Sequence, residues 1–243
     1  MRMRSFLILR LVGVMQGWSG HSYEGQRPLV EYPTRSGVLG LLAACLGIKR
    51  NDVQNLSALS RSLRYAVRCD ARAYLQRALV DYHTVQNARE SYQGLKSHDT
   101  IQTWRSYQCD AAYTVALWLQ PDAHWSLEQI AQATRTPRYT PFLGRRSCPI
   151  TRPLFERLIE ADNALMALEQ VEPMPCPDGV QKSGKSLPVN TVYSEEAFEM
   201  LPGKTRHQYS KEVRDEPFGL QPRQFARRWV HVYTSSGGRD VSQ

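Results

Sequence analysis

AAYTVALWLQ, residues 111–120, carries the strongest β-strand signal in this 243-residue chain. Its Tyr, Thr, Val and Trp residues favour an extended backbone, and Pro121-Asp122 ends the run. Helical patterns follow this stretch and a long polar segment precedes it. The sequence therefore predicts a β-strand here, and the neighbouring elements are placed relative to it.

Two helices are predicted after this strand. Ser126-Leu-Glu-Gln129 matches a capping box, in which the first and fourth side chains each bond the other residue's backbone N–H, and it opens a short helix. Pro153 suits the first turn of a second helix, which we predict over residues 154–170, LFERLIEADNALMALEQ.

Three strands are predicted before it. Residues 5–13 are apolar and β-prone, residues 63–69 alternate between apolar and partly basic positions, and residues 78–82 form a third candidate. The polar stretch 83–110 has few aliphatic residues and little helical periodicity. We interpret that stretch as a long insertion between strands.

TRSGVLGLLAACLGI (34–48) predicts a deeply packed helix, with Thr34 as its N-cap and Gly47 just past its end. Arg35 and Ser36 lie at the helix start, where free N–H groups can hold an anion such as an RNA phosphate. The alternative is simple capping by Thr34, with Arg35 in solvent.

The predicted order is β-α-β-β-(long polar insert)-β-α, which resembles a ferredoxin-like unit with an extended hairpin. We therefore predict an α+β fold: a ferredoxin-like domain over residues 1–170, with an extended hairpin inserted at about 83–110. Residues 171–192 are rich in Pro, Gly and Ser and predict a flexible linker or insertion. Residues 193–243 predict a small antiparallel C-terminal β region, with a strand at 224–234.

The chain is basic, with a net charge of +8 and a pI near 9.4. Such a balance favours a polyanionic partner. The charge is segregated, because residues 129–155 hold five arginines and no acid, whereas residues 153–200 hold nine acids and three bases. Glu195, Glu196 and Glu199 among these acids predict a solvated acidic face. Segregation of this kind suits an RNA-facing surface.

Five widely spaced cysteines form no C-x-x-C pair, which predicts reduced thiols in a cytoplasmic protein. No apolar run approaches ~20 residues, so no membrane-spanning helix is expected. Residues 179–186, GVQKSGKS, match the P-loop pattern, but nearby prolines oppose the strand and helix that a phosphate site needs. We interpret the match as chance, and we predict no cofactor and no metal.

The segment TPRYTPFLGRRSCP (136–149) combines groups that suit RNA. Arginines are bidentate phosphate donors, an aromatic ring can stack on a base, and glycine allows close backbone approach. The alternative is a basic surface loop with a buried Phe142. The candidate contacts are Arg138, Tyr139, Gly144, Arg145, Arg146 and Ser147.

Basic and aromatic residues also alternate over residues 81–110, as in an arm that grips single-stranded RNA. The candidate contacts are Tyr82, His83, Arg89, Lys96, Trp104 and Arg105. Two alternatives stay open: a polar hairpin whose aromatic rings pack on the body, and a metal-free ribonuclease in which His83, His98, Lys96 or a tyrosine is the general acid or base.

Several segments together resemble the Cas5 family, in the form found in type I-E CRISPR surveillance complexes (Cascade). They are LRLVGVMQGW, YPTRSGVLGLLAACLGI, DYHTV, GLKSHDTIQTWR, RYTPFLGRRSCP, RDEP and PRQFARR. The resemblance implies a ferredoxin-like domain of the RRM and RAMP type, in which the hairpin at about 83–110 forms a thumb. It implies a subunit that caps the 5′ handle of CRISPR RNA through this thumb and a glycine-rich loop at 142–148. It also implies contacts with the Cascade backbone subunit and the large subunit, and with target DNA through the assembled complex, but none with a membrane.

The resemblance lowers the weight of a catalytic role, because a separate Cascade subunit cuts the precursor RNA in this subtype. The expectation is therefore a noncatalytic RNA-binding subunit that acts in antiviral DNA targeting. The alternative function is a metal-independent endoribonuclease that processes CRISPR repeat RNA.

Overall fold

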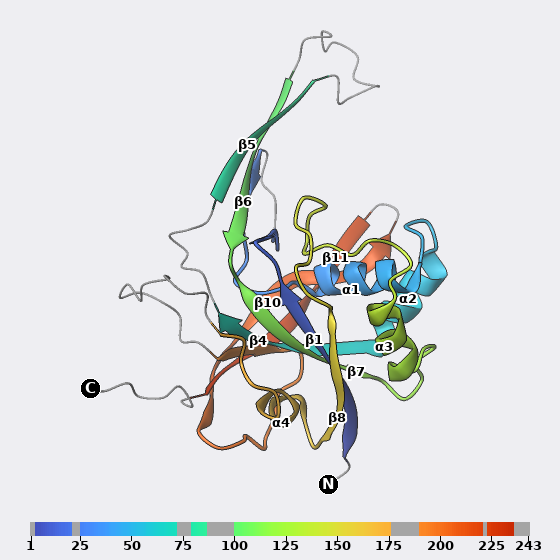
Figure 1. Cartoon of the computed structure of the whole chain (residues 1–243), viewed down its shortest axis with the longest axis vertical. Helices are drawn as coiled ribbons and strands as arrows, with labels where there is room; N and C mark the ends of the chain where they lie inside the picture. The colour runs from blue at the N-terminus through green and yellow to red at the C-terminus, as the bar shows by residue number, and fades with distance from the viewer. Residues whose placement is uncertain are drawn as a thin grey trace, which may run out of the picture.

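A seven-stranded sheet forms the body of the protein, in a computed structural model that describes residues 3–20, 25–71, 79–86, 100–175, 190–220 and 223–235 (Figure 1). The strand order is β10-β11-β9-β4-β7-β1-β8, and every neighbouring pair is antiparallel. The strands are β1 (Arg4–Val12), β4 (Leu63–Ala71), β7 (Ala112–Leu119), β8 (Phe155–Ala161), β9 (Thr191–Ser194), β10 (Thr205–Leu220) and β11 (Arg223–Ser235).

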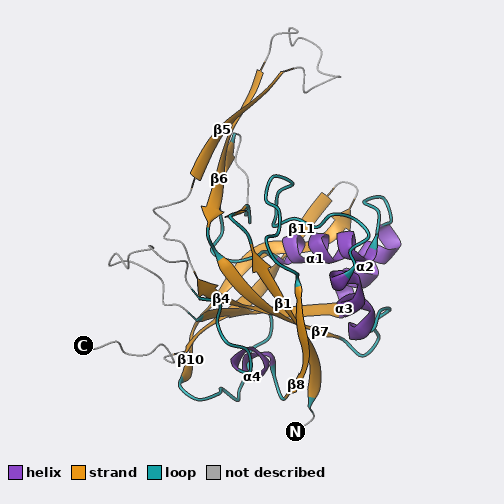
Figure 2. Ribbon diagram, in the orientation of Figure 1, coloured by secondary structure: helices purple, strands orange, loops and turns teal. Residues whose placement is uncertain are grey.

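Both faces of this sheet are covered, because successive side chains of a strand point to opposite faces. In β1, Leu7 and Leu9 belong to one buried cluster, and Phe6 and Ile8 belong to another. The first cluster packs under three helices and the second under a single short helix (Figure 2). These helices are α1 (Arg35–Leu46), α2 (Val53–Ser62) and α3 (Leu127–Arg135) on the first face, and α4 (Ala164–Glu169) on the second.

The predictions for the central strand and for two helix starts are confirmed. The strand predicted at 111–120 is β7, which pairs with β1 and β4. Thr34 caps α1 by accepting a hydrogen bond from the N–H of Gly37, and Gly47 ends the helix with φ +75°. The predicted capping box of Ser126 and Gln129 opens α3.

The helix predicted over residues 154–170 is wrong. The segment instead forms β8, which pairs with the edge of β1, and then α4. Asn163 separates the two and caps α4 by accepting from the N–H of Met166. The open edge of β1 supplies backbone partners that a helix would leave unused, so the tertiary context overrides the helical pattern.

A hairpin of two long strands, β5 (Leu79–Gln86) and β6 (Thr100–Cys109), projects from the body, and we call it the thumb (Figure 1). Two short strands, β2 (Met15–Gln16) and β3 (Gln26–Arg27), pair with β6 and attach the thumb to the N-terminal segment. The predicted contacts Arg89 and Lys96, and also His98, lie outside the described residues.

The C-terminal strands β9, β10 and β11 continue the main sheet, because β9 pairs with both β4 and β11. We call β10 and β11 the C-terminal hairpin. Residues 176–189, which include the P-loop-like sequence, lie outside the described residues. Among the described helices, none has the length and apolar character to span a bilayer.

A buried charge network lies within the sheet around Asp70. Its carboxylate accepts from Arg68 Nε at 2.6 Å and from Arg10 Nη1 at 2.9 Å, and also from the hydroxyl of Thr114. The N–H of Met174 donates to the same carboxylate at 3.1 Å. This group therefore joins β1, β4 and β7 to the segment that leads into residues 176–189.

Candidate nucleic-acid interface

A cavity of about 440 Å³ lies where α1, the segment after β2 and the loop 142–148 meet. We call it the glycine-loop cavity. Small residues form most of its wall, with the rings of Trp18 and Phe142 beside them. Three of the predicted contacts line it, namely Ser36, Gly144 and Arg145. The structure thus brings together two segments that are about a hundred residues apart in the sequence.

Gly144 is required by the backbone at this point. Its φ is +84°, and a Cβ built there would lie 2.3 Å from the carbonyl oxygen of Gly17. The loop is held on this segment by a hydrogen bond from Gly17 N–H to the carbonyl of Leu143, at 2.9 Å. Gly144 therefore permits a close backbone approach within the protein, between the loop and the segment at Gly17.

Arg145 points into the protein. Its Nη1 donates to the carbonyl of Ser106 at 2.7 Å, and its Nη2 donates to Oγ of Ser19 at 2.7 Å. The guanidinium carbon lies 4.6 Å from the centre of the Tyr107 ring. Arg145 therefore fastens the loop to the root of the thumb, and these donors are not directed at solvent as a phosphate ligand requires.

Arg146 and Ser147, the next two predicted contacts, are exposed. Arg138 and Tyr139 are also exposed, and their backbone N–H groups donate to the carbonyls of Cys45 and Ala44 at the end of α1, both at 3.0 Å. The backbone at Arg138 and Tyr139 is therefore held at the end of α1, with both side chains exposed.

The thumb presents an aromatic pair. Tyr82 and Trp104 face each other across β5 and β6, with ring centroids 5.3 Å apart, and their exposed fractions are 53% and 38%. The ring of Trp104 also lies over Gly25, and the backbone N–H of Trp104 donates to the carbonyl of Gly25 at 2.9 Å. A half-exposed aromatic pair on a projecting hairpin offers a stacking surface for a base.

His83 and Arg105 lie on the other face of the thumb, because neighbouring residues of a strand alternate. His83 Nδ1 is 3.9 Å from a carboxylate oxygen of Asp81, and Arg105 Nε donates to Oγ1 of Thr103 at 3.1 Å. The described residues hold no group of three or more His, Cys, Asp and Glu side chains that could bind a metal ion.

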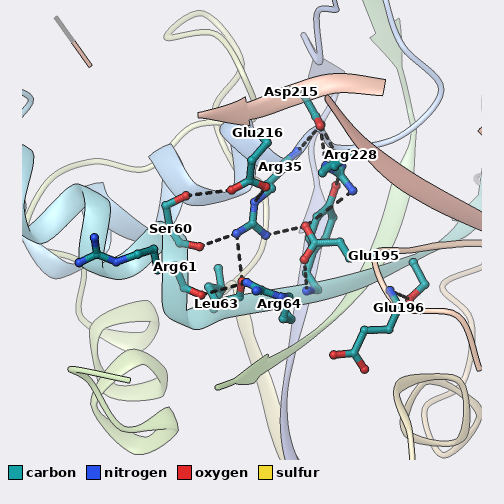
Figure 3. Close-up of polar contacts among 12 residues, drawn as sticks. Arg35, Ser60, Arg61, Leu63, Arg64, Glu195, Glu196, Asp215, Glu216 and Arg228 are labelled. Atoms are coloured by element: carbon teal, nitrogen blue, oxygen red, sulfur yellow. Dashed lines mark hydrogen bonds and ion pairs between the residues drawn. The ribbon is translucent and has the colours of Figure 1, made fainter. Parts of the chain in front are cut away.

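Arg35 does not take either predicted role. Its side chain is buried, so it is not in solvent, and its backbone N–H donates to Asp215 Oδ2 at 2.9 Å, so a carboxylate of the protein already occupies the anion position at the start of α1 (Figure 3). The guanidinium forms ion pairs with Glu195 and Glu216. The expectation of RNA contact by Arg35 therefore needs correction, since every described partner is internal.

The same cluster corrects the solvated acidic face predicted for Glu195, Glu196 and Glu199, because Glu195 is buried, whereas Glu196 is partly exposed and Glu199 is exposed. Glu195 is buried beside Arg35 and Arg228, and Glu196 accepts from the indole N–H of Trp118 at 3.2 Å. Burial raises the pKa of Glu195, and the two guanidinium groups oppose that rise. No local pattern marks the carboxylate partners of Arg35, which lie 160 or more positions from it.

With this geometry in view, comparison with known proteins assigns the family. The sequence profile of the family described as "CRISPR-associated protein (Cas_Cas5)" matches residues 6–231. The chain belongs to the Cas5 family. A curated relative, "CRISPR system Cascade subunit CasD" of Escherichia coli (strain K12), is 49% identical over 247 residues, which cover 99% of this chain and all of the relative.

Solved structures agree with the Cas5 assignment. A chain of a "CRISPR RNA-guided surveillance complex" is similar with a TM-score of 0.65 and 28% identity, over 95% of this chain and 91% of the other. A structure titled "Crystal structure of Cas protein" has a TM-score of 0.54 at 24% identity, with 93% of each chain covered, and it supports the fold alone. This Cas5-family chain thus has a mixed α/β fold with a largely antiparallel sheet.

Proposed function

We propose that this Cas5-family protein is a noncatalytic RNA-binding subunit of a type I-E Cascade complex in the cytoplasm. In this proposal it caps the 5′ handle of CRISPR RNA and joins the backbone subunit to the large subunit, so that it acts on target DNA through the assembled complex. Likeness over the full length to a Cascade subunit supports the assignment. The observation that carries it is the exposed aromatic pair on the thumb, above a glycine-loop cavity with exposed basic residues beside it.

The strand order supports a finer description of the fold. In chain order, β1-α1-β4-β7-α3-β8 has the alternation of a ferredoxin-like unit, and its four strands are adjacent in the order β4-β7-β1-β8. We infer that residues 1–170 form this ferredoxin-like, RNA-binding domain, with the thumb inserted between β4 and β7. The C-terminal hairpin then extends its sheet.

The proposed RNA surface contains the candidate residues that are exposed, are partly exposed on the thumb, or line the cavity. Tyr82 and Trp104 stack on bases, and Arg146 and Arg138 contact phosphates. Arg145 and Arg35 support this surface from inside. The remaining members are Ser36, His83, Arg105, Tyr139, Gly144 and Ser147, together with Arg89 and Lys96 outside the described residues.

Binding of a labelled handle RNA tests the proposal. We expect Trp104→Ala to weaken binding by ~1–3 kcal/mol, the range for one lost stacking contact. The matched control is Trp229→Ala, because Trp229 is also exposed (58%) but lies on the C-terminal hairpin. Equal losses in both variants, or equal affinity of the wild type for a scrambled RNA, would contradict the proposed site.

A cleavage assay tests the noncatalytic part of the proposal. Repeat RNA incubated with the purified protein in EDTA should stay intact, because a subunit that only binds RNA supplies no general acid and general base to the scissile phosphate. Specific cleavage that disappears in His83→Ala or His98→Ala would show that the protein is a metal-independent ribonuclease instead.

A further inference from the structure

The C-terminal hairpin contacts the start of α1 through Asp215. One oxygen of this carboxylate accepts the backbone N–H of Arg35 at 2.9 Å, and the guanidinium of Arg228 donates to both oxygens, at 2.6 and 3.0 Å. Charged hydrogen bonds of this bidentate kind fix the geometry of both partners. Asp215 on β10 and Arg228 on β11 therefore hold the first residue of α1 in one place (Figure 3).

The side chain of Arg35 extends the same connection into the core. Its guanidinium forms ion pairs with Glu195, next to the end of β9, and with Glu216 on β10. It also donates to the carbonyl of Leu63 at the start of β4, at 3.1 Å. The side chains of Arg35 and Glu195 are only 2% and 7% exposed. A buried charge cluster tolerates little displacement, since a lost partner leaves a charge unpaired away from water.

The residues that follow Arg35 form a wall of the glycine-loop cavity. Ser36, Gly37 and Gly40 line the cavity from the first turns of α1. Because a helix is stiff over so short a distance, the position of its first residue sets the position of these three. The hairpin therefore determines where one wall of the proposed RNA surface lies.

We propose that the C-terminal hairpin is a positioning element for RNA binding, and that Asp215 and Arg228 are positioning residues that act through Arg35 and α1 without touching RNA. The inference rests on the proposed function. It assigns to Asp215 a role in guide-RNA affinity that its negative charge would not suggest.

The sign of one substitution separates positioning from simple electrostatics. Asp215→Asn removes a negative charge near the RNA surface, so electrostatics alone would strengthen binding. Positioning requires the opposite result, because an amide cannot satisfy both the helix N–H and the Arg228 guanidinium as the carboxylate does. We expect Asp215→Asn to weaken the binding of handle RNA by about tenfold, within the range of coupling between two sites.

Glu216→Gln provides a second variant. The Glu216 side chain is 30% exposed, so this substitution should destabilise the fold less than one at a fully buried residue of the cluster. Glu212→Gln is the control, since it removes one negative charge from the same strand at an exposed ion pair with Arg227. Affinities are measured on the full-length protein, with the RNA-competent fraction determined by stoichiometric titration. Amide hydrogen exchange should quicken at residues 37–40 of α1 but not in β7.

Weaker binding in Asp215→Asn and Glu216→Gln, with Glu212→Gln unchanged and exchange altered only in α1, supports the inference. Unchanged or tighter binding in both cluster variants overturns it, while wild-type binding of the handle still upholds the proposed function. A wild-type protein that does not distinguish the handle from a scrambled RNA overturns the proposed function, and the inference with it.

Discussion

Arg145 and Arg146 are adjacent in the sequence and have different surroundings. Arg145 donates to Ser106 and Ser19 and covers the Tyr107 ring, whereas Arg146 is exposed. The sequence does not show which of the two side chains points inward, because the direction of each depends on the turn at Gly144 and on the root of the thumb. At the residue scale, the basic loop therefore contains one internal clamp and one outward charge.

The two arginines should respond differently to salt. Arg146→Ala is expected to lower the log–log salt dependence of RNA binding by about 0.7, the value for one phosphate contact with a single strand. Arg145→Ala should weaken binding with little change in that slope, because its guanidinium bonds the protein. Titrations at several salt concentrations check this, and equal slope changes in both variants would show that Arg145 contacts phosphate after all.

α1 illustrates the element scale, because its glycines have opposite surroundings. A Cβ at Gly40 would meet nothing within 4 Å, whereas a Cβ at Gly37 would lie 2.8 Å from the ring of Trp18. Glycine in a helix interior costs up to ~1 kcal/mol relative to alanine. Replacing glycine by alanine should therefore raise the free energy of unfolding at Gly40, where the added methyl group fits, but not at Gly37, where it would clash with Trp18.

We expect Gly40→Ala to raise the free energy of unfolding by roughly 0.5–1 kcal/mol and, because Gly40 lines the glycine-loop cavity, to weaken RNA binding. Gly37→Ala on the same helix should lower stability. Urea unfolding and RNA titration of the same samples measure both quantities. Gly40→Ala protein with unchanged RNA affinity would place the RNA away from this wall.

Local signals predicted the elements that local contacts define. Thr34, Gly47 and the Ser126 capping box marked helix ends correctly because their bonds span a few residues. The segment 154–170 failed because the edge of β1, far away in the sequence, decides its conformation. The alternation of basic and aromatic residues made Tyr82 and Trp104 candidates, and their contact with RNA stays a prediction. The internal role of Arg35 depends on partners that no spacing rule connects.

The whole sheet depends on charges buried inside it. Asp70 bonds Arg10 and Arg68, and the exposed fractions of these three residues are only 2%, 4% and 5%. The sequence showed Arg10 as an interruption of an apolar run, and only the assembled sheet shows what neutralises it. Such a network ties three strands and the segment at Met174 into one cooperative unit.

Asp70→Ala should lower the free energy of unfolding by ~3–5 kcal/mol, because it leaves two buried guanidinium groups without their shared carboxylate. The control is Asp122→Ala, an exposed carboxylate in the turn after β7, whose effect should stay within about 0.5 kcal/mol. Thermal and urea unfolding measure both. If Asp70→Ala lowers the free energy of unfolding no more than Asp122→Ala does, water must reach the guanidinium groups of Arg10 and Arg68.

The contact between Arg35 and the C-terminal hairpin also has a consequence for biosynthesis. The carboxylate partners of Arg35 are added at least 160 residues after it, which at ribosomal speed is on the order of ten seconds or more. During that interval the nascent chain carries an arginine whose carboxylate partners do not yet exist. The start of α1 can therefore take its final place only once β9 and β10 have been made, so the proposed RNA surface is completed late in synthesis.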